Sequence, residues 1–423
     1  MDNSFSSHFA FDDALNDEAK IAVVGVGGGG GNAVNNMIEK GIHGVEFFAI
    51  NTDSQALSMN LAPTKLQAGR DLTKGLGAGA RPAVGAHAIE ETREDLTELL
   101  RGFDMIFITA GMGGGTGTGG APIVAAIAKE LGILSVAIVT KPFDCEGRRR
   151  HQAAETGIQL LKENVDTLII IPNERLLDIA DVDTTLMDAF GKADEVLYNA
   201  TRGISDLITV HGLINLDFAD VRTTMQEGGT ALMGAAMAAG DSRAEKAATE
   251  ALSSPLLDGL SIHGARNVLV NITAGKSLGI REATAATSII QREAGDDVEV
   301  IFGTVIDEEM GDELRITVIA TGFDGPSRST AQGTGKTRKL PLDEAGPVIQ
   351  YKGEEALQKL DMPAYQRRNS SSVSVEPPSK AAGDGAPPQS RIRRLNAEDM
   401  ERRPQAVSTD KEEMPAFLRK MLD

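Results

Sequence analysis

Two glycine-rich segments, each between a short aliphatic run and a helical stretch, constrain the fold of this chain most. The first runs from Gly25 to Gly31, interrupted only by Val26, and the second runs from Gly113 to Gly119. Because glycine has no Cβ, such segments let backbone N–H groups approach an anion at a helix start, which we expect near Asn32 for the first. Loops after parallel strands open on one edge of a sheet, so both segments are expected to reach one ligand. With threonines in the second, they fit a polyphosphate better than one pyrophosphate.

Continuous apolar runs alternate with helical stretches through the first 210 residues. Runs without polar alternation are typical of parallel strands that are covered on both faces, and their alternation with helices indicates βαβ units. The expected strands are Ile21–Val26, Val45–Ile50, Met105–Thr109, Leu134–Val139 and Thr167–Ile171. The pattern therefore predicts a doubly wound α/β domain over residues 20–212.

The last part of this domain is a long amphipathic stretch, which predicts a connecting helix over about 184–209. Beyond it we expect a second, smaller α+β domain over residues 213–322. Its predicted strands are Val268–Ile272, Val298–Val305 and Leu314–Ala320, and its predicted helices are Ala244–Leu252 and Arg281–Ala294. A helix shared by both domains is suited to placing a site at their junction.

The two termini differ in composition from this body. Residues 323–423 hold 10 of the 16 prolines but only 7 of the 46 glycines, and we expect residues 323–411, like residues 1–19, to be disordered. The tail has 17 Lys and Arg against 15 Asp and Glu, so the net charge of −19 leaves −21 on the body. An acidic body repels phosphate backbones, which argues against nucleic-acid binding.

Other sequence features point to a cytoplasmic protein. Cys145 is the single cysteine, which excludes a disulfide framework. No basic segment with a long apolar run opens the chain, and no apolar stretch approaches 18 residues, so we expect neither a secretion signal nor direct membrane insertion.

The last dozen residues, 412–423, carry an apolar pattern of their own. Met414, Phe417, Leu418, Met421 and Leu422 recur at helical spacing. A helix this short is marginal alone and is expected to form in a partner's groove, the alternative being a frayed end. Residues 362–368 echo residues 414–420, either as a weak duplicate or by coincidence.

Familiar nucleotide-binding signatures are incomplete. Lys276-Ser277 and Lys336-Thr337 resemble the end of a P-loop, but the glycine required upstream is Val270 in one and Thr330 in the other. Any phosphate site here works without a P-loop lysine.

The sequence resembles the tubulin and FtsZ family, and within it bacterial FtsZ. The segment from Gly113 to Gly119 matches the family's signature loop, and the match extends over roughly residues 20–322. Further matching segments are residues 25–32, 51–53, 75–80, 140–143 and 215–222, and residues 414–420 are similar to the family's C-terminal partner-binding peptide. Arg81 and Cys145 depart from the usual pattern without removing a motif residue.

The resemblance implies a GTP/GDP site, with Mg²⁺ bound through the nucleotide phosphates. The phosphate-binding positions it implies are Gly28, Gly29, Gly30, Gly31, Asn32, Gly115, Thr116 and Gly117. Glu146 and Arg150 match positions that hold the ribose and nearby phosphates, while Asn173, Phe190 and Asp194 match the base pocket. By themselves, Glu146 and Arg150 are better interpreted as an ordinary surface pair and Phe190 as a core residue, and the two glycine segments reverse that preference.

The resemblance also implies a catalytic role for Asp217 and Asp220, with Asn215 beside them. Taken alone, the two aspartates are a common helix-start pattern. They follow the connecting helix, roughly 30 Å from Phe190 at 1.5 Å per residue, so they cannot reach the nucleotide of their own chain. In a head-to-tail polymer they complete the neighbour's site.

The implied function is a self-assembling cytoskeletal GTPase of the division ring, located in the cytoplasm at mid-cell. Residues 412–423 are expected to bind membrane-tether and regulatory division proteins. A dehydrogenase explains only the first glycine segment, and a nonenzymatic scaffold explains only the tail. Nucleotide identity and nucleotide-dependent assembly discriminate among the three.

Overall fold

The computed structural model describes residues 19–178, 183–210, 212–257 and 260–323, which belong to one compact unit. The expected N-terminal extension, apart from Ala19, the linker after Phe323 and the terminal peptide 412–423 lie outside the described residues.

One ten-stranded sheet runs through the described unit in the order β3-β2-β1-β4-β5-β6-β7-β10-β8-β9. Its first six strands are mutually parallel. These strands are β1 Ile21–Val26, β2 Glu46–Asn51, β3 Thr64–Gln67, β4 Met105–Gly111, β5 Leu134–Lys141 and β6 Thr167–Pro172. The five strands expected from apolar runs are all present, and the predicted α/β class is confirmed, while the short edge strand β3 had no such signal.

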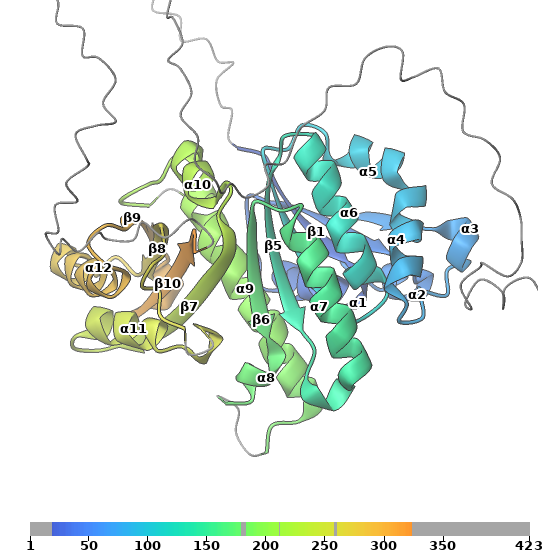
Figure 1. Ribbon diagram of the computed structural model, residues 1–423. Coiled ribbons are helices and arrows are strands. Elements are labelled where there is room, and N and C mark those ends of the chain that lie inside the picture. Colours follow the sequence, from blue (N-terminus) through green and yellow to red (C-terminus); the bar gives the residue numbers. More distant parts are fainter. Residues whose placement is uncertain (1–18, 179–182, 211, 258–259, 324–423) are drawn as a thin grey trace, which may run out of the picture. The chain divides into compact units, whose positions relative to one another are not determined.

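Alternate residues of the parallel strands enter two separate cores. Ile21 and Val23 of β1 pack with helices α1 and α9, whereas Ala22 and Val24 pack on the opposite face with α5, α6 and α7. Figure 1 shows helices on both sides of this part of the sheet. The helices of this half are α1 Gly27–Glu39, α2 Ser54–Ser58, α3 Arg70–Thr73, α4 Pro82–Glu91, α5 Arg93–Leu100, α6 Thr116–Glu130, α7 Arg148–Lys162, α8 Asn173–Leu176 and α9 Leu186–Thr209, with the 3₁₀ turn η1 Asp144–Glu146. Helix α1 thus begins at Gly27, five residues before the expected start near Asn32, because the glycines themselves form its first turn.

The remaining strands continue the sheet with mixed pairing. Strand β7 runs parallel to β6 at its start and antiparallel to β10 beyond that, and β10 pairs antiparallel with β8, which pairs parallel with β9. These strands are β7 Gly229–Ala239, β8 Asn267–Ala274, β9 Glu299–Ile306 and β10 Glu313–Thr321. The helical elements here are α10 Phe218–Met225, α11 Arg243–Leu252, α12 Ile280–Ala294 and the 3₁₀ turns η2 Pro255–Leu257 and η3 Glu308–Met310.

Strand β7 joins the two halves and was not predicted. Its sequence is mostly alanine and glycine, which have low strand propensity. A Cβ at Gly234 would lie 2.1 Å from the Ala251 carbonyl oxygen, so a small residue is required where α11 packs on the strand. Tertiary packing, not local preference, therefore makes this segment a strand.

Helix α9 lies between the halves, close to the range predicted for the connecting helix. Thr185 caps its first turn by accepting a hydrogen bond from the Asp188 backbone N–H. Val196, Ala200 and Ile204 of its buried stripe pack in the core. No helix in the described part of the chain is both long and apolar enough to cross a bilayer.

Candidate functional site

A cavity of about 590 Å³ lies at the carboxyl edge of the parallel strands. Segments that follow or end strands β1, β2, β4, β5 and β6 all contribute to its wall. The contributing residues include Gly28, Gly29, Asn32, Asn51, Gly111, Gly115, Thr116, Gly117, Thr140 and Asn173. Both glycine segments thus line one cavity, as expected for loops at the same edge of a parallel sheet.

The two glycine segments are packed against each other without room for side chains. A Cβ at Gly27 would lie 2.7 Å from the Gly117 backbone nitrogen, and one at Gly30 would lie 2.3 Å from the Thr109 carbonyl oxygen. By contrast, a Cβ at Gly28 would meet nothing within 4 Å. Gly28 therefore borders open space, while Gly30 is a buried spacer that does not line the cavity.

Gly31 faces an adjoining hollow of about 340 Å³ that shares Gly28 and Asn32 with the main cavity. The Gly31 carbonyl oxygen accepts a hydrogen bond of 2.8 Å from Asn60 Nδ2. Of the eight predicted phosphate-binding positions, all except Gly30 and Gly31 border the main cavity.

Helices α1 and α6 both begin at the cavity, and neither has a side-chain cap at its N-terminus. The first N–H groups of a helix have no acceptor within the helix, so two uncapped starts provide donors for an anion. Hydroxyl groups hold the second loop in place: Thr52 Oγ1 lies 2.6 Å from Thr116 Oγ1, and the Gly113 N–H donates to Thr118 Oγ1 at 2.8 Å.

The far end of the cavity combines an aromatic ring with two acceptor groups. Phe190 is 41% exposed and packs edge-to-face on Phe143 at 5.2 Å between ring centroids, so it is not a core residue. Burial raises the pKa of Asp194 to about 6. Asn173 is 4% exposed, and its Oδ1 finds no hydrogen-bond partner among the described residues. An aromatic face beside a carboxylate and an unpaired amide oxygen fits a planar heterocycle that carries N–H donors.

Glu146 and Arg150 form an ion pair and also line the cavity. The other oxygen of Glu146 accepts a 3.0 Å hydrogen bond from the Phe143 backbone N–H. Glu146 lies in the 3₁₀ turn η1 and Arg150 in the first turn of α7. Both interpretations of Glu146 and Arg150 are therefore correct, because the two residues form an ion pair and the pair lies on the wall of the cavity.

Several cavity-lining residues were not among the predicted site positions. They include Asn51, Asp53, Ala78, Gly79, Thr140 and Pro142. Asn51 and Thr140 lie at or near the carboxyl ends of β2 and β5, so the strand-edge rule applied to every strand would have found them. Ala78 and Gly79 belong to a loop between α3 and α4 that gives no strand signal.

The predicted catalytic residues lie outside this cavity, in and after the loop that follows α9. Asp217 is the N-cap of α10, where its Oδ1 accepts a 2.8 Å hydrogen bond from the Asp220 N–H. Asn215 Oδ1 accepts a 2.6 Å bond from the Gly212 N–H. All three side chains belong to exposed residues, and Figure 1 shows α10 at the opposite end of α9 from α8. Asp217 and Asp220 therefore do begin a helix, as the sequence pattern indicates, and their carboxylates remain accessible to solvent.

The same loop is anchored on β9. Ile214 donates its N–H to Thr304 Oγ1 at 2.9 Å, and the Thr304 N–H donates to the Ile214 carbonyl oxygen at 3.0 Å. A Cβ at Gly212 would lie 1.6 Å from the Thr304 carbonyl oxygen, so only glycine fits this turn. The loop's position is consequently fixed by the second half of the sheet.

Comparison with known proteins assigns both halves to one family. Residues 20–181 match the model of the tubulin/FtsZ family GTPase domain, and residues 229–324 match that of the FtsZ family C-terminal domain. Solved structures agree. An FtsZ mutant from M. jannaschii is 43% identical, with a TM-score of 0.70 over 72% of this chain and 91% of that one.

An empty FtsZ dimer from M. jannaschii is 40% identical, with a TM-score of 0.71 over 79% of this chain and 96% of that one. GDP-bound CetZ1 from Haloferax volcanii, at 21% identity and a TM-score of 0.61 over 73% of this chain and 96% of that one, shares the fold. The cavity, the glycine loops and these matches lead to one assignment: the chain belongs to the tubulin/FtsZ family and carries its GTPase domain.

Proposed function

We propose that this chain hydrolyses GTP in head-to-tail filaments, in which each active site is completed by the next subunit. The observation that carries the proposal is a separation along α9. Phe190 and Asp194 lie at the cavity end of the helix, whereas Asp217 follows its other end. From Phe190 to Thr209 the helix alone rises about 28 Å, so one chain cannot bring both ends to one nucleotide.

In this proposal the cavity holds the nucleotide from base to phosphates. The N-termini of α1 and α6, through Gly28, Gly29 and the segment from Gly115 to Gly117, donate backbone N–H groups to the phosphates. Arg150 and Glu146 hold phosphate and ribose, while Asp194 and Asn173 accept N–H bonds from guanine. Adenine offers no such pair of donors to Asp194, which favours GTP over ATP.

Mg²⁺ is proposed to bind through the nucleotide phosphates and to neutralise their charge. Within the described residues no group of three or more His, Cys, Asp or Glu is placed to hold a metal ion. Thr116 and Asn51 line the cavity and supply side-chain oxygen atoms there, which suits a cation that keeps part of its water shell.

Exposed apolar side chains at both ends support the filament. Leu76, 84% exposed, borders the cavity, and Met187, also 84% exposed, precedes Phe190 on α9. At the other end Leu213, 70% exposed, lies in the loop with Asn215. A heterologous contact buries such residues from both ends and generates an open filament. Among the structural relatives are an FtsZ dimer and a CetZ2 GTPγS-bound protofilament, the latter 22% identical to this chain, with a TM-score of 0.60 over 72% of this chain and 93% of that one.

Asp217 and Asp220 of one subunit are proposed to position the attacking water at the neighbour's terminal phosphate. Two carboxylates at the start of one helix, one at the N-cap and one in the first turn, can orient a water and accept its proton as the bond to phosphorus forms. Loss of phosphate then weakens the contact and drives filament turnover. In the cell, we propose that these filaments form a cytoplasmic division ring at mid-cell, attached through residues 412–423 to membrane-tether and regulatory proteins.

Sedimentation and phosphate release, measured together over a series of protein concentrations, test the proposal. We expect polymer to pellet with GTP but not with GDP or ATP, and phosphate release per subunit to rise above the same threshold concentration as pelleting. Turnover per subunit that is constant down to dilute, monomeric protein would contradict the shared site. NAD binding without assembly would favour the dehydrogenase instead.

A further inference from the structure

Arg81, which departs from the usual family pattern, lies beside the nucleotide cavity. It directly follows residues 78–80, which line that cavity. This loop packs on the second glycine segment, because a Cβ at Gly115 would lie 2.7 Å from Ala78 Cβ and 3.0 Å from the Arg81 backbone nitrogen. Since Gly115 is one of the proposed phosphate donors, the backbone holds Arg81 at the phosphate end of the cavity.

The side chain of Arg81 folds back over the same loop. Its Nη2 and Nε lie 3.8 and 3.9 Å from the position that a Cβ would take on Gly79, which itself lines the cavity. Arg81 is exposed, and its guanidinium forms no ion pair or side-chain hydrogen bond with another described residue. A guanidinium with its N–H donors unused by the described chain is therefore available beside the cavity wall.

Arg81 also occupies a position where arginine is unfavourable for the helix. It is the N-cap of α4, which begins with Pro82 and has no side-chain cap. Asn, Asp, Ser and Thr are preferred at an N-cap because a side-chain oxygen accepts from the first N–H groups, and a guanidinium has no acceptor. A cation near a helix N-terminus is also repelled by the helix dipole. Residues that break a local rule in this way are expected at functional sites.

The wall of the nucleotide cavity has little positive charge of its own. Arg150 is the only Lys or Arg among the described residues that line it, and Arg150 is paired with Glu146. Asp53 and Asp194 add two further carboxyl groups to the wall. A triphosphate in this cavity is therefore stabilised by an additional cation, and a guanidinium offers phosphate oxygens a charge-assisted, bidentate bond.

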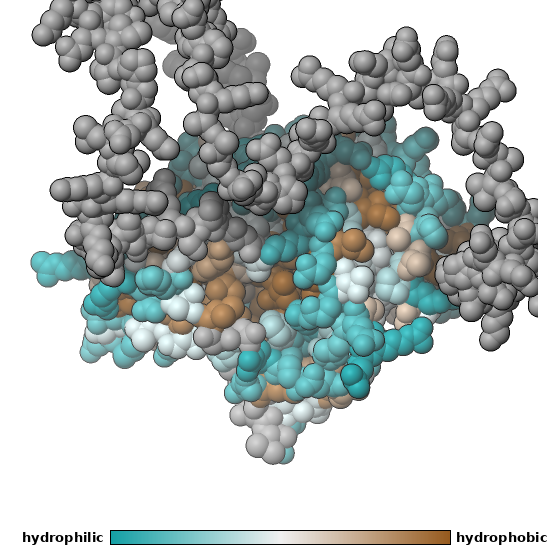
Figure 2. Space-filling view, viewed as in Figure 1, coloured by the Kyte–Doolittle hydropathy of each residue, from teal (hydrophilic) through white to brown (hydrophobic). Residues whose placement is uncertain are grey.

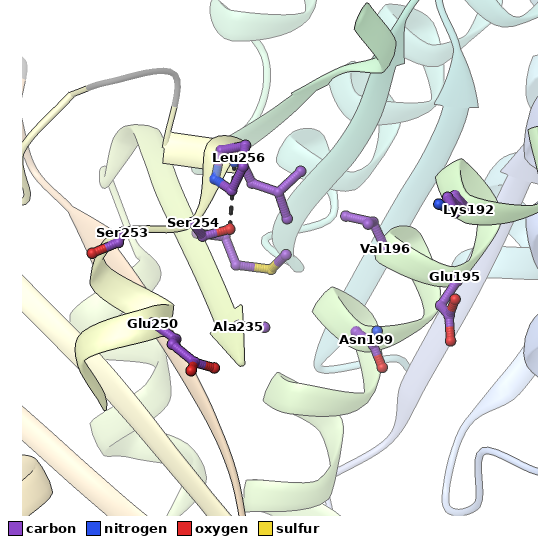
Figure 3. Close-up of a pocket in the computed structure, with 11 residues that line it drawn as sticks. Lys192, Glu195, Val196, Asn199, Ala235, Glu250, Ser253, Ser254 and Leu256 are labelled. Atoms are coloured by element: carbon purple, nitrogen blue, oxygen red, sulfur yellow. Dashed lines mark hydrogen bonds between the residues drawn. The ribbon is translucent and has the colours of Figure 1, made fainter. Parts of the chain in front are cut away.

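A second cavity, of about 430 Å³, has no such unused cation among its described residues. It lies between α9 and the second half of the sheet, and Figure 2 shows apolar surface gathered in the middle of the face that carries β6 and β7. Figure 3 shows Lys192 and Glu195 on α9 and Glu250 on the opposite wall. Lys192 acts on its own helix: hydrogen bonds from Thr185 lower the pKa of Asp188, and Lys192 lowers it further.

We propose that Arg81 binds the terminal phosphate of GTP and thereby distinguishes GTP from GDP. The guanidinium moves from above Gly79 to the mouth of the cavity and donates N–H bonds to oxygens of that phosphate. GDP lacks the terminal phosphate, so the contact contributes to the binding of the triphosphate alone. The inference rests on the proposed binding of GTP in this cavity, but it requires neither hydrolysis nor a second subunit.

Affinities of the full chain for GTPγS and GDP, measured below the threshold concentration for pelleting, test this role. We expect Arg81→Asn to weaken GTPγS binding about tenfold and GDP binding less than about twofold. Because asparagine caps a helix well, the melting temperature without nucleotide should stay the same or rise. The matched control is Arg101→Asn, which removes the same charge from an exposed arginine between α5 and β4, at the opposite edge of the parallel strands. It should leave both affinities unchanged.

Arg81→Lys keeps the cation but loses the planar fork, and it should recover part of the lost GTPγS affinity. Equal weakening of GTPγS and GDP binding by Arg81→Asn would overturn the proposal. Unchanged affinities would also overturn it, and if the threshold for pelleting with GTP rose at the same time, Arg81 would belong to the contact with the next subunit. An unsubstituted chain that binds neither nucleotide would instead remove the proposed function, and the role of Arg81 with it.

Discussion

The two ends of α9 differ in what they provide. At its N-terminal end, Phe190 and Asp194 line a cavity with two uncapped helix starts, and the carboxylates on its wall, Asp53, Glu146 and Asp194, belong to half-buried residues. At its other end, Asp217 and Asp220 are exposed carboxylates on a loop held by β9, and they border no described part of that cavity. One end offers N–H donors for phosphates and the other offers exposed carboxylates, which is the physical basis for proposing a site shared between subunits.

The largest expected effect is a loss of GTP turnover when Asp217, at the end of α9 away from the cavity, is substituted. Asp217 both caps α10 and carries the proposed catalytic charge, so its substitution by alanine mixes two losses. Asp217→Asn keeps a side-chain acceptor for the Asp220 N–H but removes the charge. We expect GTP turnover to fall by roughly 10²- to 10⁴-fold, with GTP affinity and thermal stability close to those of the unsubstituted chain. Steady-state phosphate release and calorimetric GTP binding measure the two quantities, and unchanged turnover would remove Asp217 from the mechanism.

At the nucleotide end of α9, two glycines in the first turn of α1 test which positions pack against the protein and which face the cavity. Gly30→Ala places a Cβ against the Thr109 carbonyl oxygen, and we expect it to lower the free energy of unfolding by about 1–3 kcal/mol or more. Gly28→Ala points into open space, and in a helix it should leave stability unchanged or raise it by up to about 1 kcal/mol.

Urea unfolding without nucleotide separates these effects from binding. If the cavity holds phosphates, the methyl group of Gly28→Ala should still weaken GTP binding, because it occupies space next to the helix start. Equal loss of stability in both variants would show that the packing at Gly30 has been misjudged.

The smallest expected effect is a pH dependence of GTP affinity. Burial raises the pKa of Asp194 to about 6, so the carboxylate is mostly ionised at pH 7 and mostly protonated at pH 5. Only the ionised form accepts two N–H bonds from guanine, and the dissociation constant should therefore rise about tenfold between pH 7 and pH 5. Calorimetric titration with GDP over this range measures it. Asp194→Asn is the control: it should bind more weakly at pH 7 and lose most of the pH dependence, and a wild-type affinity that is flat with pH would argue against the assigned base contact.

Sequence reasoning was strongest where one local signal specified both structure and chemistry. The apolar runs ending at Val26 and Thr109 located β1 and β4, and the glycines after them located the cavity. Strand β7 escaped detection because alanine and glycine have weak strand propensity, and its pairing with β6 and β10 depends on partners far along the chain.

Within the site, sequence could not separate lining glycines from packing glycines. Gly28 and Gly30 lie in one uninterrupted run of glycines, and it is the neighbouring Thr109 carbonyl that makes Gly30 a spacer. Likewise the unpaired Oδ1 of Asn173 depends on burial in the folded chain, which no local pattern records. The cavity between α9 and the segments around Met233 and Leu256 was also invisible in the sequence, since its walls come from segments more than 30 residues apart.

Mixing two inactive variants tests the shared site most directly. Gly28→Leu adds an apolar side chain at the nucleotide cavity, where a Cβ would meet no atom within 4 Å, and keeps Asp217, whereas Asp217→Asn keeps the cavity but lacks the charge. Each alone should be nearly inactive. In a 1:1 mixture with random order, about a quarter of the contacts join an intact cavity to an intact Asp217, so about a quarter of the unsubstituted turnover should return. A mixture no more active than its two components measured separately would contradict a site built from two subunits.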